Sequence, residues 1–260
     1  MGLSLKGRKV IDIGSAYGGF VIQCAKEGAI AQGIEIEPNL HELALENAKR
    51  EEGHIALERG NVLDRSVLPG EKFDLLIIND VFEHVFDVES FFGRIAALSD
   101  KKATVYFAIP NGESYHSINR EGHKFLFALT LLEPGSWGSV VGDFNIYYRP
   151  LDLYRYYFYK AGYRYLYVKV DFAEAEKARA RVSAKFAEIA EKLEQDPFDN
   201  PVLNARAREK FELLRQKLDH DLKRDDPMIV HLKYEQYFWI GYGSKRKIRS
   251  PGLFLIPESY

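Results

Sequence analysis

Short apolar runs alternate with amphipathic stretches along the first part of the chain. The amphipathic stretches repeat apolar residues every three or four positions, as in Leu40, Leu43, Ala44 and Ala48. The apolar runs have the length of buried strands and occupy residues 9–13, 31–36, 55–59, 73–78 and 103–109. This alternation predicts a doubly wound parallel α/β sheet, with helices at 19–27 and 88–98 among its crossovers.

Two further strands complete the predicted sheet. A helix at 151–160 precedes a strand at 163–170, and a last strand is predicted from Ile229 to Gly241. The chain is therefore predicted to form a seven-stranded sheet.

A helical hairpin is predicted before the last strand, within residues 171–228. Its apolar residues lie three or four positions apart, which places them on one face of each of two helices: Val182, Phe186, Ile189 and Leu193, then Leu203, Ala207, Phe211, Leu214 and Leu218. Asp196-Pro197 ends the first helix, and Asn200-Pro201 caps and opens the second. The hairpin could be a lid over the substrate, a contact in a homodimer or a docking arm, and periodicity does not choose between them.

The predicted domains are the sheet core and the segments that a plain α/β sheet would not contain. Residues 1–170 plus 229–243 form the core, and the aromatic-rich stretch 111–150 is an insertion on the substrate side or a packed cover. Residues 171–228 are the helical insertion. Residues 244–260 are a tail whose basic run, Lys245 to Arg249, contacts an anionic ligand or is simply solvated.

Composition narrows the class of protein. The 260 residues, 46% of them hydrophobic, can bury one substantial core plus an appendage. A net charge of −2 gives no support for nucleic acid as a partner. The one cysteine, Cys24, cannot form a disulfide within the chain, and apolar runs stop short of the roughly 20 residues that span a bilayer. We expect a cytoplasmic protein with no membrane partner.

The candidate chemistry begins at a glycine turn after the first strand, in the run Val10 to Gly19. Glycines there let the backbone approach a ligand closely, because a side chain would occupy the ligand's place. One unit later the second strand ends in Gly33-Ile34-Glu35, and the Glu35 carboxylate can accept hydrogen bonds from both hydroxyls of a ribose. The two segments together predict a nucleoside-binding crevice.

Two classes of cofactor use such a crevice. A dinucleotide needs three glycines, and here Ala16 replaces the middle one between Gly14 and Gly19, which disfavours a nicotinamide-dependent oxidoreductase. What remains, an acidic residue followed by Gly14 and Gly18, resembles motif I of the class I S-adenosylmethionine-dependent methyltransferases.

The resemblance covers residues 8–170 plus the last strand and implies a Rossmann-like methyltransferase sheet that binds S-adenosylmethionine. After the third strand the family commonly holds the adenine with an Asp, where this chain has Asn61, whose amide can also hydrogen-bond the adenine edge. The positions that the resemblance assigns to the cofactor are Asp12, Gly14, Ser15, Gly18, Glu35, Ile36, Asn61, Val62 and Asn79.

A second, local resemblance concerns residues 80–125. Asp80, Glu83-His84, Pro110-Asn111 and His123-Lys124-Phe125 are similar to the metal-dependent Hen-type methyltransferases, which modify the 2′ hydroxyl at the 3′ end of small RNAs. The resemblance implies a divalent ion held by Asp80, Glu83, His84 and His123, and such mixed ligands suit Mn²⁺, Fe²⁺ or Zn²⁺ better than Mg²⁺. Asp80 stands where that family has a Glu. Methyltransferases for small molecules and glycans carry the same Glu-His without a metal, and there the His acts as a base or packs.

We therefore predict an S-adenosylmethionine-dependent methyltransferase that methylates a hydroxyl group of a small metabolite or a glycan. Asp80, Glu83, His84 and His123 are predicted to lie nearest the chemistry, with Asp80, His84 and His123 as the catalytic candidates. The alternatives are a metal-dependent RNA 2′-O-methyltransferase and a nucleotide-binding scaffold without catalysis.

Overall fold

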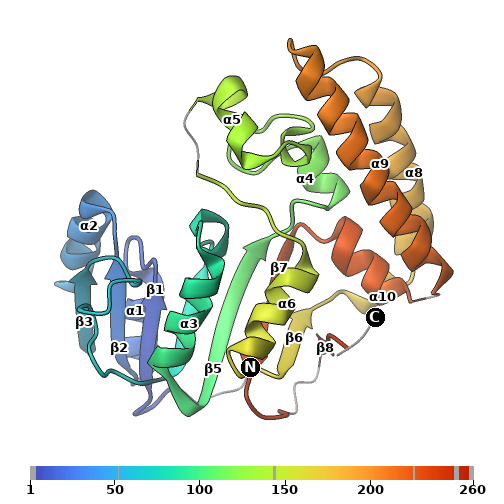
Figure 1. Cartoon of the computed structure of the whole chain (residues 1–260). Helices are drawn as coiled ribbons and strands as arrows, with labels where there is room; N and C mark the ends of the chain where they lie inside the picture. Colours follow the sequence, from blue (N-terminus) through green and yellow to red (C-terminus); the bar gives the residue numbers. More distant parts are fainter. Residues whose placement is uncertain (1–3, 52, 143–144, 225, 249–251, 258–260) are drawn as a thin grey trace. The chain divides into compact units, whose positions relative to one another are not determined.

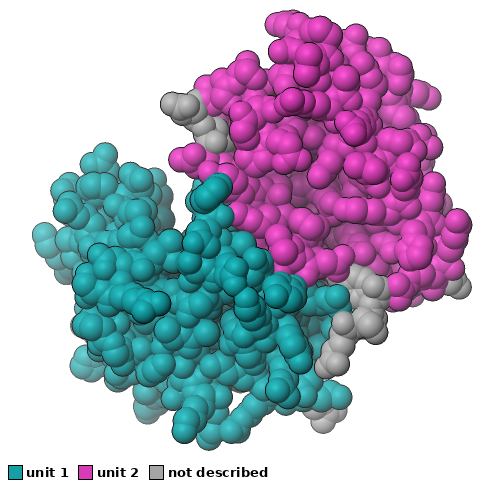
Figure 2. Space-filling model, in the orientation of Figure 1, with its two compact units in different colours: residues 1–109, 155–168, 240–260 teal, residues 110–154, 169–239 magenta. Residues whose placement is uncertain are grey.

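The computed structural model describes residues 4–51, 53–142, 145–224, 226–248 and 252–257 (Figure 1). The chain divides into two compact units, which Figure 2 colours separately. Unit 1 comprises residues 1–109, 155–168 and 240–260, and unit 2 comprises residues 110–154 and 169–239.

The sheet is the frame of unit 1 and has the order β3-β2-β1-β4-β5-β7-β6-β8. Neighbours from β3 to β5 pair in parallel, whereas β6 and β7 pair antiparallel. The strands are β1 (Lys9–Ile13), β2 (Ile30–Glu35), β3 (His54–Arg59), β4 (Phe73–Asn79), β5 (Ser99–Pro110), β6 (Tyr165–Lys169), β7 (Phe238–Ser244) and β8 (Leu253–Leu255). The predicted Rossmann-like α/β sheet is thus confirmed, but it is mixed and not parallel throughout, because β6 and β7 run antiparallel.

Helices cover both faces of this sheet: α1 (Gly19–Lys26), α2 (Pro38–Ala48), α3 (Val88–Leu98) and α6 (Leu151–Lys160). The Tyr106 ring on β5 lies 5.9 Å from Phe20 of α1, whereas the next residue, Phe107, lies 5.0 Å from Phe158 of α6. Successive side chains on a strand point to opposite faces, so α1 and α6 cover opposite faces. Phe92 of α3 lies 4.8 Å from Phe158, so α3 shares the face of α6 (Figure 1).

Two predictions about the sheet are wrong. The described residues form eight strands, because the short β8 follows β7, so the helical stretch 171–228 precedes the last described strand but one. The stretch from Ile229, predicted as the start of a strand, is helical: α10 (Pro227–Val230) runs into a π-helical turn, η3 (His231–Glu235). Asp226 caps α10 by accepting hydrogen bonds from the amides of Met228 and Ile229, so the strand begins only at Phe238.

Unit 2 is helical. Its elements are α4 (Tyr115–Asn119), η2 (Leu129–Leu131), α5 (Pro134–Val141), α7 (Phe172–Ala175), α8 (Ala178–Leu193), α9 (Pro201–Lys223), α10 and η3. The stretches 111–150 and 171–228, separated in the sequence-based division, contribute to one buried apolar cluster that joins Trp137 to Phe186 and Phe211. The domain boundaries expected from sequence stay a prediction.

Helices α8 and α9 lie antiparallel. Arg179, at the start of α8, donates to the carbonyl of Leu222 near the end of α9, and Arg208 in α9 donates to the carbonyl of Leu193 at the end of α8. Asn200 caps α9, as the sequence predicts, by accepting from the amide of Val202. The apolar faces meet at Phe186 and Phe211, whose rings lie 5.4 Å apart.

No described helix is long and apolar enough to cross a membrane. Of the predicted basic run in the tail, Lys245 to Ile248 are described, and Lys245 donates to the carbonyl of Asp100. Arg249 lies outside the described residues, as do 250, 251 and 258–260 of the predicted tail.

One buried amide secures the start of unit 2. Asn111 has no exposed surface, and its side-chain nitrogen lies 3.2, 3.0 and 2.9 Å from the carbonyl oxygens of Leu232, Lys233 and Gln236. Its side-chain oxygen accepts from the amide of Glu113 at 3.0 Å. Asn111 therefore holds the residues after β5 against the π-helical turn that precedes β7.

We expect Asn111→Ala to lower the free energy of unfolding by about 2–3 kcal/mol, because several buried backbone groups lose their partner. Urea denaturation followed by circular dichroism measures this. The matched control is Asn47→Ala, which removes one exposed hydrogen bond to the carbonyl of Tyr17 and should cost about 0.5 kcal/mol or less. Equal losses in the two variants would contradict the assignment.

Candidate functional site

A cavity of about 340 Å³ opens in unit 1 at the carboxyl ends of the parallel strands, where open α/β sheets bind ligands. The segments after β1, β2, β3 and β4 all contribute to it. Four predicted cofactor positions line the cavity: Gly14, Ile36, Asn61 and Val62. We call this cavity, with its lining residues, the crevice.

The glycine turn after β1 forms one wall of the crevice. Gly14 has a φ of 73°, and a Cβ there would lie 2.6 Å from the Cγ2 of Val81, closer than atoms approach in proteins. Both the conformation and the space therefore require glycine. Gly18, with φ 80°, is the N-cap residue of α1; a Cβ there would contact Ala44, and Gly18 does not line the crevice.

Glu35 is buried, with 5% of its surface exposed, and fixes the geometry of the turn. One carboxylate oxygen accepts from the amide of Ala16 at 2.8 Å, and the other accepts from the amide of Glu37 at 2.9 Å. Ala16 needs this support because its φ of 43° lies in the left-handed region. Each carboxylate oxygen can accept a second hydrogen bond, so Glu35 retains the capacity to bind hydroxyl groups.

Asp12 lies in β1 beneath this turn and is 2% exposed. Burial, together with the negative charge of Glu35, raises the pKa of Asp12 to about 7. The two acidic side chains that the sequence assigns to the cofactor are therefore close enough to repel each other. A positively charged ligand group beside them would favour the ionised form of Asp12.

Two predicted cofactor residues, Ser15 and Asn79, are not among the residues that line the crevice. Ser15 is 5% exposed, and its hydroxyl has no hydrogen-bond partner among the described residues. The Asn79 amide donates to the Asp80 carboxylate at 2.8 Å at the end of β4. Neither residue lines the crevice, so their contact with a cofactor stays a prediction.

An apolar wall, whose residues are not among the predicted cofactor positions, completes the crevice. It comprises Val81, Val85, Phe86 and Phe91 on the segment after β4 and on α3. The Phe86 ring is 78% exposed, which is unusual for a large apolar side chain. The position of this segment directly after a buried strand was the available signal. Such a wall suits the flat face of a purine.

The predicted catalytic and metal-binding residues belong to both units. Asp80, Glu83 and His84 lie in unit 1, and His123 lies in unit 2. His84 lines the crevice, Glu83 is 1% exposed, and 3.9 Å separates His84 Nε2 from Glu83 Oε1. A carboxylate beside an imidazole is chemically suited to Mn²⁺ or Zn²⁺. Their role as metal ligands, with Asp80 and His123, stays a prediction.

Within unit 2, His123 is oriented by a buried carboxylate. Its Nδ1 lies 2.8 Å from an oxygen of Glu121, which also accepts from the hydroxyl of Tyr148 at 2.6 Å. Burial alone would raise the pKa of Glu121, but hydrogen bonds from His123, Tyr148 and the amides of Lys124 and His123 outweigh it and lower that pKa to about 2. Glu121 thus stays ionised at neutral pH.

The sequence model of a family described as "Methyltransferase domain" matches residues 2–168. The chain belongs to this family. It is a class I S-adenosylmethionine-dependent methyltransferase, as predicted from motif I and Glu35.

Relatives of this methyltransferase carry a narrower name. "Ubiquinone biosynthesis O-methyltransferase" from Rhodopseudomonas palustris (strain TIE-1) is 30% identical over 125 residues, which are 48% of this chain and 46% of that protein. A protein of the same name from Coxiella burnetii (strain Dugway 5J108-111) is 24% identical over 127 residues, 49% of this chain and 50% of that protein. The chain therefore spans about half the length of the curated relatives it matches.

A solved structure shares the fold along most of the chain. The S-adenosylmethionine-dependent methyltransferase from Mesorhizobium loti has a TM-score of 0.54 and 16% identity, and the match covers 93% of each chain. At that identity the likeness concerns the fold.

The raised pKa of Asp12 predicts a pH-dependent stability. Its contribution to the free energy of unfolding is fully present below about pH 4 and is lost as pH rises through about 7, because ionisation is disfavoured in the folded state. Asp12→Asn does not titrate, so its stability relative to the parent should rise by on the order of 2–4 kcal/mol across this window. Denaturation midpoints at several pH values measure the difference.

The control is Asp64→Asn. Asp64 is exposed, and hydrogen bonds from Ser66 lower its pKa, so it is ionised throughout this window and its difference from the parent should stay flat. A flat Asp12→Asn profile would show that Asp12 is already ionised in the folded protein.

Proposed function

We propose that this methyltransferase transfers a methyl group to a hydroxyl oxygen of a small metabolite or a glycan, with S-adenosylmethionine bound in the crevice of unit 1. The observation that carries the proposal is the pairing of the Gly14 turn with the buried Glu35 carboxylate at the ends of adjacent strands. The names of the relatives from Rhodopseudomonas palustris and Coxiella burnetii support oxygen as the methylated atom.

The residues of the crevice fit the parts of the proposed cofactor. Glu35 is proposed to accept hydrogen bonds from the ribose hydroxyls, and Asn61 to bond the adenine edge beside Val62 and the apolar wall. Asp12, with Glu35 nearby, supplies negative charge for the cationic methionine part. Asn61 already accepts from the amide of Leu63, which leaves its side-chain amide hydrogens for a ligand.

When bound, S-adenosylmethionine supplies a methyl group on a positively charged sulfur. The acceptor oxygen would take that methyl group from the sulfur, and the hydroxyl proton of the acceptor would have to pass to a group of the chain. The chain's task is then to hold the acceptor oxygen in line, exclude water and accept the proton.

His84 is proposed as the group that receives the proton. It lies in the short 3₁₀ turn η1 (Phe82–His84) after β4, and its side chain is 47% exposed at the crevice. Imidazole is the common base near neutral pH because its pKa lies close to that pH. The carboxylate of Glu83 lies 3.9 Å from Nε2 and would stabilise the charged imidazolium.

We expect Glu35→Ala to weaken the binding of S-adenosylhomocysteine by about tenfold or more, since hydrogen bonds to a charged group are lost. Gly14→Val should nearly abolish binding, because its side chain would overlap Val81. Isothermal titration calorimetry in EDTA gives both affinities. Glu37→Ala, an exposed carboxylate two residues from Glu35, is the matched control and should bind as the parent does.

The same titration distinguishes between the alternative functions that the sequence left open. Unchanged binding by Glu35→Ala would refute the crevice assignment. Repeating the titration with Mn²⁺ tests the metal-dependent alternative, which requires a stoichiometric heat from the metal itself. Binding of NAD in preference to S-adenosylhomocysteine would favour an oxidoreductase.

For His84→Asn we expect kcat to fall by about 10²-fold or more, with affinity for S-adenosylhomocysteine unchanged within about threefold. Release of S-adenosylhomocysteine in the presence of catechol, 4-hydroxybenzoate or glucose measures turnover. The control is His54→Asn, because His54 starts β3 at the opposite end of the strands. A fall in turnover of the same size in both variants would remove His84 from the role of base.

A further inference from the structure

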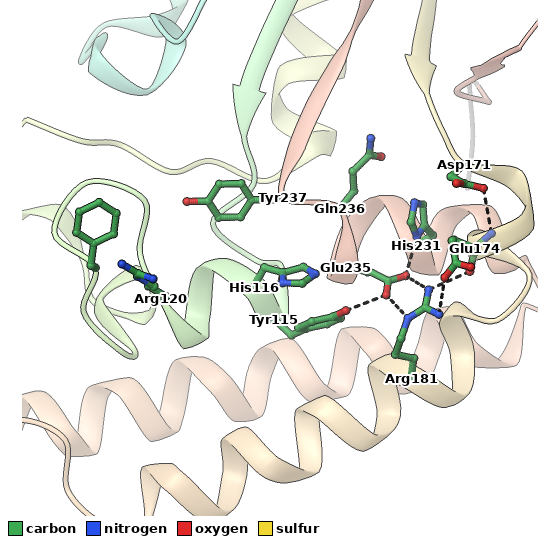
Figure 3. Close-up of a pocket in the computed structure, with 11 residues that line it drawn as sticks. Tyr115, His116, Arg120, Asp171, Glu174, Arg181, His231, Glu235, Gln236 and Tyr237 are labelled. Atoms are coloured by element: carbon green, nitrogen blue, oxygen red, sulfur yellow. Dashed lines mark hydrogen bonds and ion pairs between the residues drawn. The ribbon is translucent and has the colours of Figure 1, made fainter.

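Unit 2 contains its own cavity, of about 780 Å³, which no part of the proposed cofactor site uses. Figure 3 shows Arg120 at one end of it and Arg181 at the other, with His116 and Tyr237 between them. The two arginines differ in their surroundings, and this difference determines what the cavity can bind.

Arg181 is fully engaged with the protein. Its guanidinium forms a bidentate ion pair with Glu235, contacts a carboxylate oxygen of Glu174 at 2.9 Å and donates to the Glu174 carbonyl at 3.0 Å (Figure 3). Glu235 also accepts from the Tyr115 hydroxyl at 2.9 Å and lies 2.7 Å from His231 Nδ1. Asp171 also lines the cavity, so three carboxylates stand against one arginine among the described lining residues of this end, and their charges sum to a negative value.

Arg120 has no carboxylate partner among the described residues. Its guanidinium lies over the ring of Phe125, with 4.6 Å between the guanidinium carbon and the ring centroid. A stacked guanidinium keeps its N–H donors in its own plane, where they can bind a carboxylate in a bidentate manner. This end of the cavity therefore combines an aromatic face with an available cation.

The loop that carries these two residues is held in a strained conformation. Phe125 has a φ of 59°, which is uncommon for a bulky residue, and its ring is 60% exposed. Backbone hydrogen bonds close the loop, from the amide of Phe125 to the carbonyl of Glu121 and from the amide of Glu121 to the carbonyl of Leu126. Strain that holds an apolar ring exposed at a cavity is typical of ligand contacts.

Aromatic groups form the middle of the cavity. The His116 ring lies 4.1 Å from the Tyr115 ring, between centroids. Burial lowers the pKa of His116 and outweighs the opposing negative charge of Glu235, so His116 is a neutral hydrogen-bonding group at pH 7. Tyr237 approaches Gly122 so closely that a Cβ there would overlap its hydroxyl oxygen. These groups suit a flat ring that carries a polar substituent.

We propose that this cavity binds a hydroxylated aromatic carboxylate, with the carboxylate on Arg120, the ring against Phe125 and the Tyr115–His116 pair, and the hydroxyl toward His116 and the acidic end. The carboxylates around Arg181 repel a second negative charge, which disfavours phosphate esters and dinucleotides. The claim that such a compound is the methyl acceptor rests on the proposed function. The claim that it binds to the cavity of unit 2 does not.

The test is calorimetric titration of the full chain with 4-hydroxybenzoate, alone and with saturating S-adenosylhomocysteine. We expect saturable binding in at least one of the two conditions. Three related probes should each bind about tenfold more weakly or worse, because each changes one feature that the site requires. They are 4-hydroxybenzyl alcohol, without the charge, 4-hydroxycyclohexanecarboxylate, without the flat ring, and 4-hydroxyphenyl phosphate, with a second charge.

Two variants test the named contacts. Arg120→Gln should weaken 4-hydroxybenzoate binding by about tenfold or more, since a charge-assisted pair is lost. Arg215→Gln is the matched control, because Arg215 is an exposed arginine of α9 that pairs with Glu212 outside the cavity. Phe125→Gly should weaken binding while the melting temperature stays the same or rises, because glycine adopts the left-handed conformation without strain. A purely structural Phe125 would not combine these two effects.

The outcomes are distinguishable. Absence of saturable binding up to about 10 mM in both conditions overturns the proposal, as does parental affinity in Arg120→Gln. Binding of 4-hydroxybenzoate that depends on Arg120, in protein that does not bind S-adenosylhomocysteine, supports this site and overturns the proposed function instead.

Discussion

The Glu35 carboxylate holds the two turns on which the crevice depends. It binds the amide of Ala16 in the turn after β1 and the amide of Glu37 after β2, so one buried charge sets both strand ends. This bond maintains Ala16 in a left-handed conformation that its side chain disfavours. The same charge helps to raise the pKa of Asp12 to about 7. The Glu35 carboxylate thus determines both the backbone geometry of the crevice and the raised pKa of Asp12.

Much of unit 1 could be predicted from sequence because its signals are local. Each parallel strand is a short apolar run, and Gly14 and Glu35 stand at the ends of adjacent strands. Asn200-Pro201 likewise marks the start of α9. Such features depend on neighbouring residues, so no knowledge of distant contacts was needed to place them.

The features that sequence could not give depend on distant contacts. Residues from Ile229 to Glu235 have the apolar content of a strand, yet Asn111, more than a hundred positions earlier, holds their carbonyls in a helical turn. The pairing of Arg181 with Glu235 joins residues 54 positions apart. Neither the Asn111 hydrogen bonds nor the ion pair of Arg181 with Glu235 produces a periodic pattern in the sequence. Arg120 is recognisable as an available cation only once its surroundings are known.

Each unit is built from segments that are separated in the sequence, and this has a consequence for biosynthesis. The polypeptide enters unit 2 at residue 110, leaves after 154, enters again at 169 and leaves after 239. Neither unit is therefore a continuous segment. A ribosome must add residues through 239 before unit 2 has all its parts. Strands β7 and β8 are also made late, and they have to join a sheet whose other strands precede them in the sequence. Until β7 pairs with it, β5 presents a row of unpaired backbone N–H and C=O groups, at which another chain can add and start aggregation.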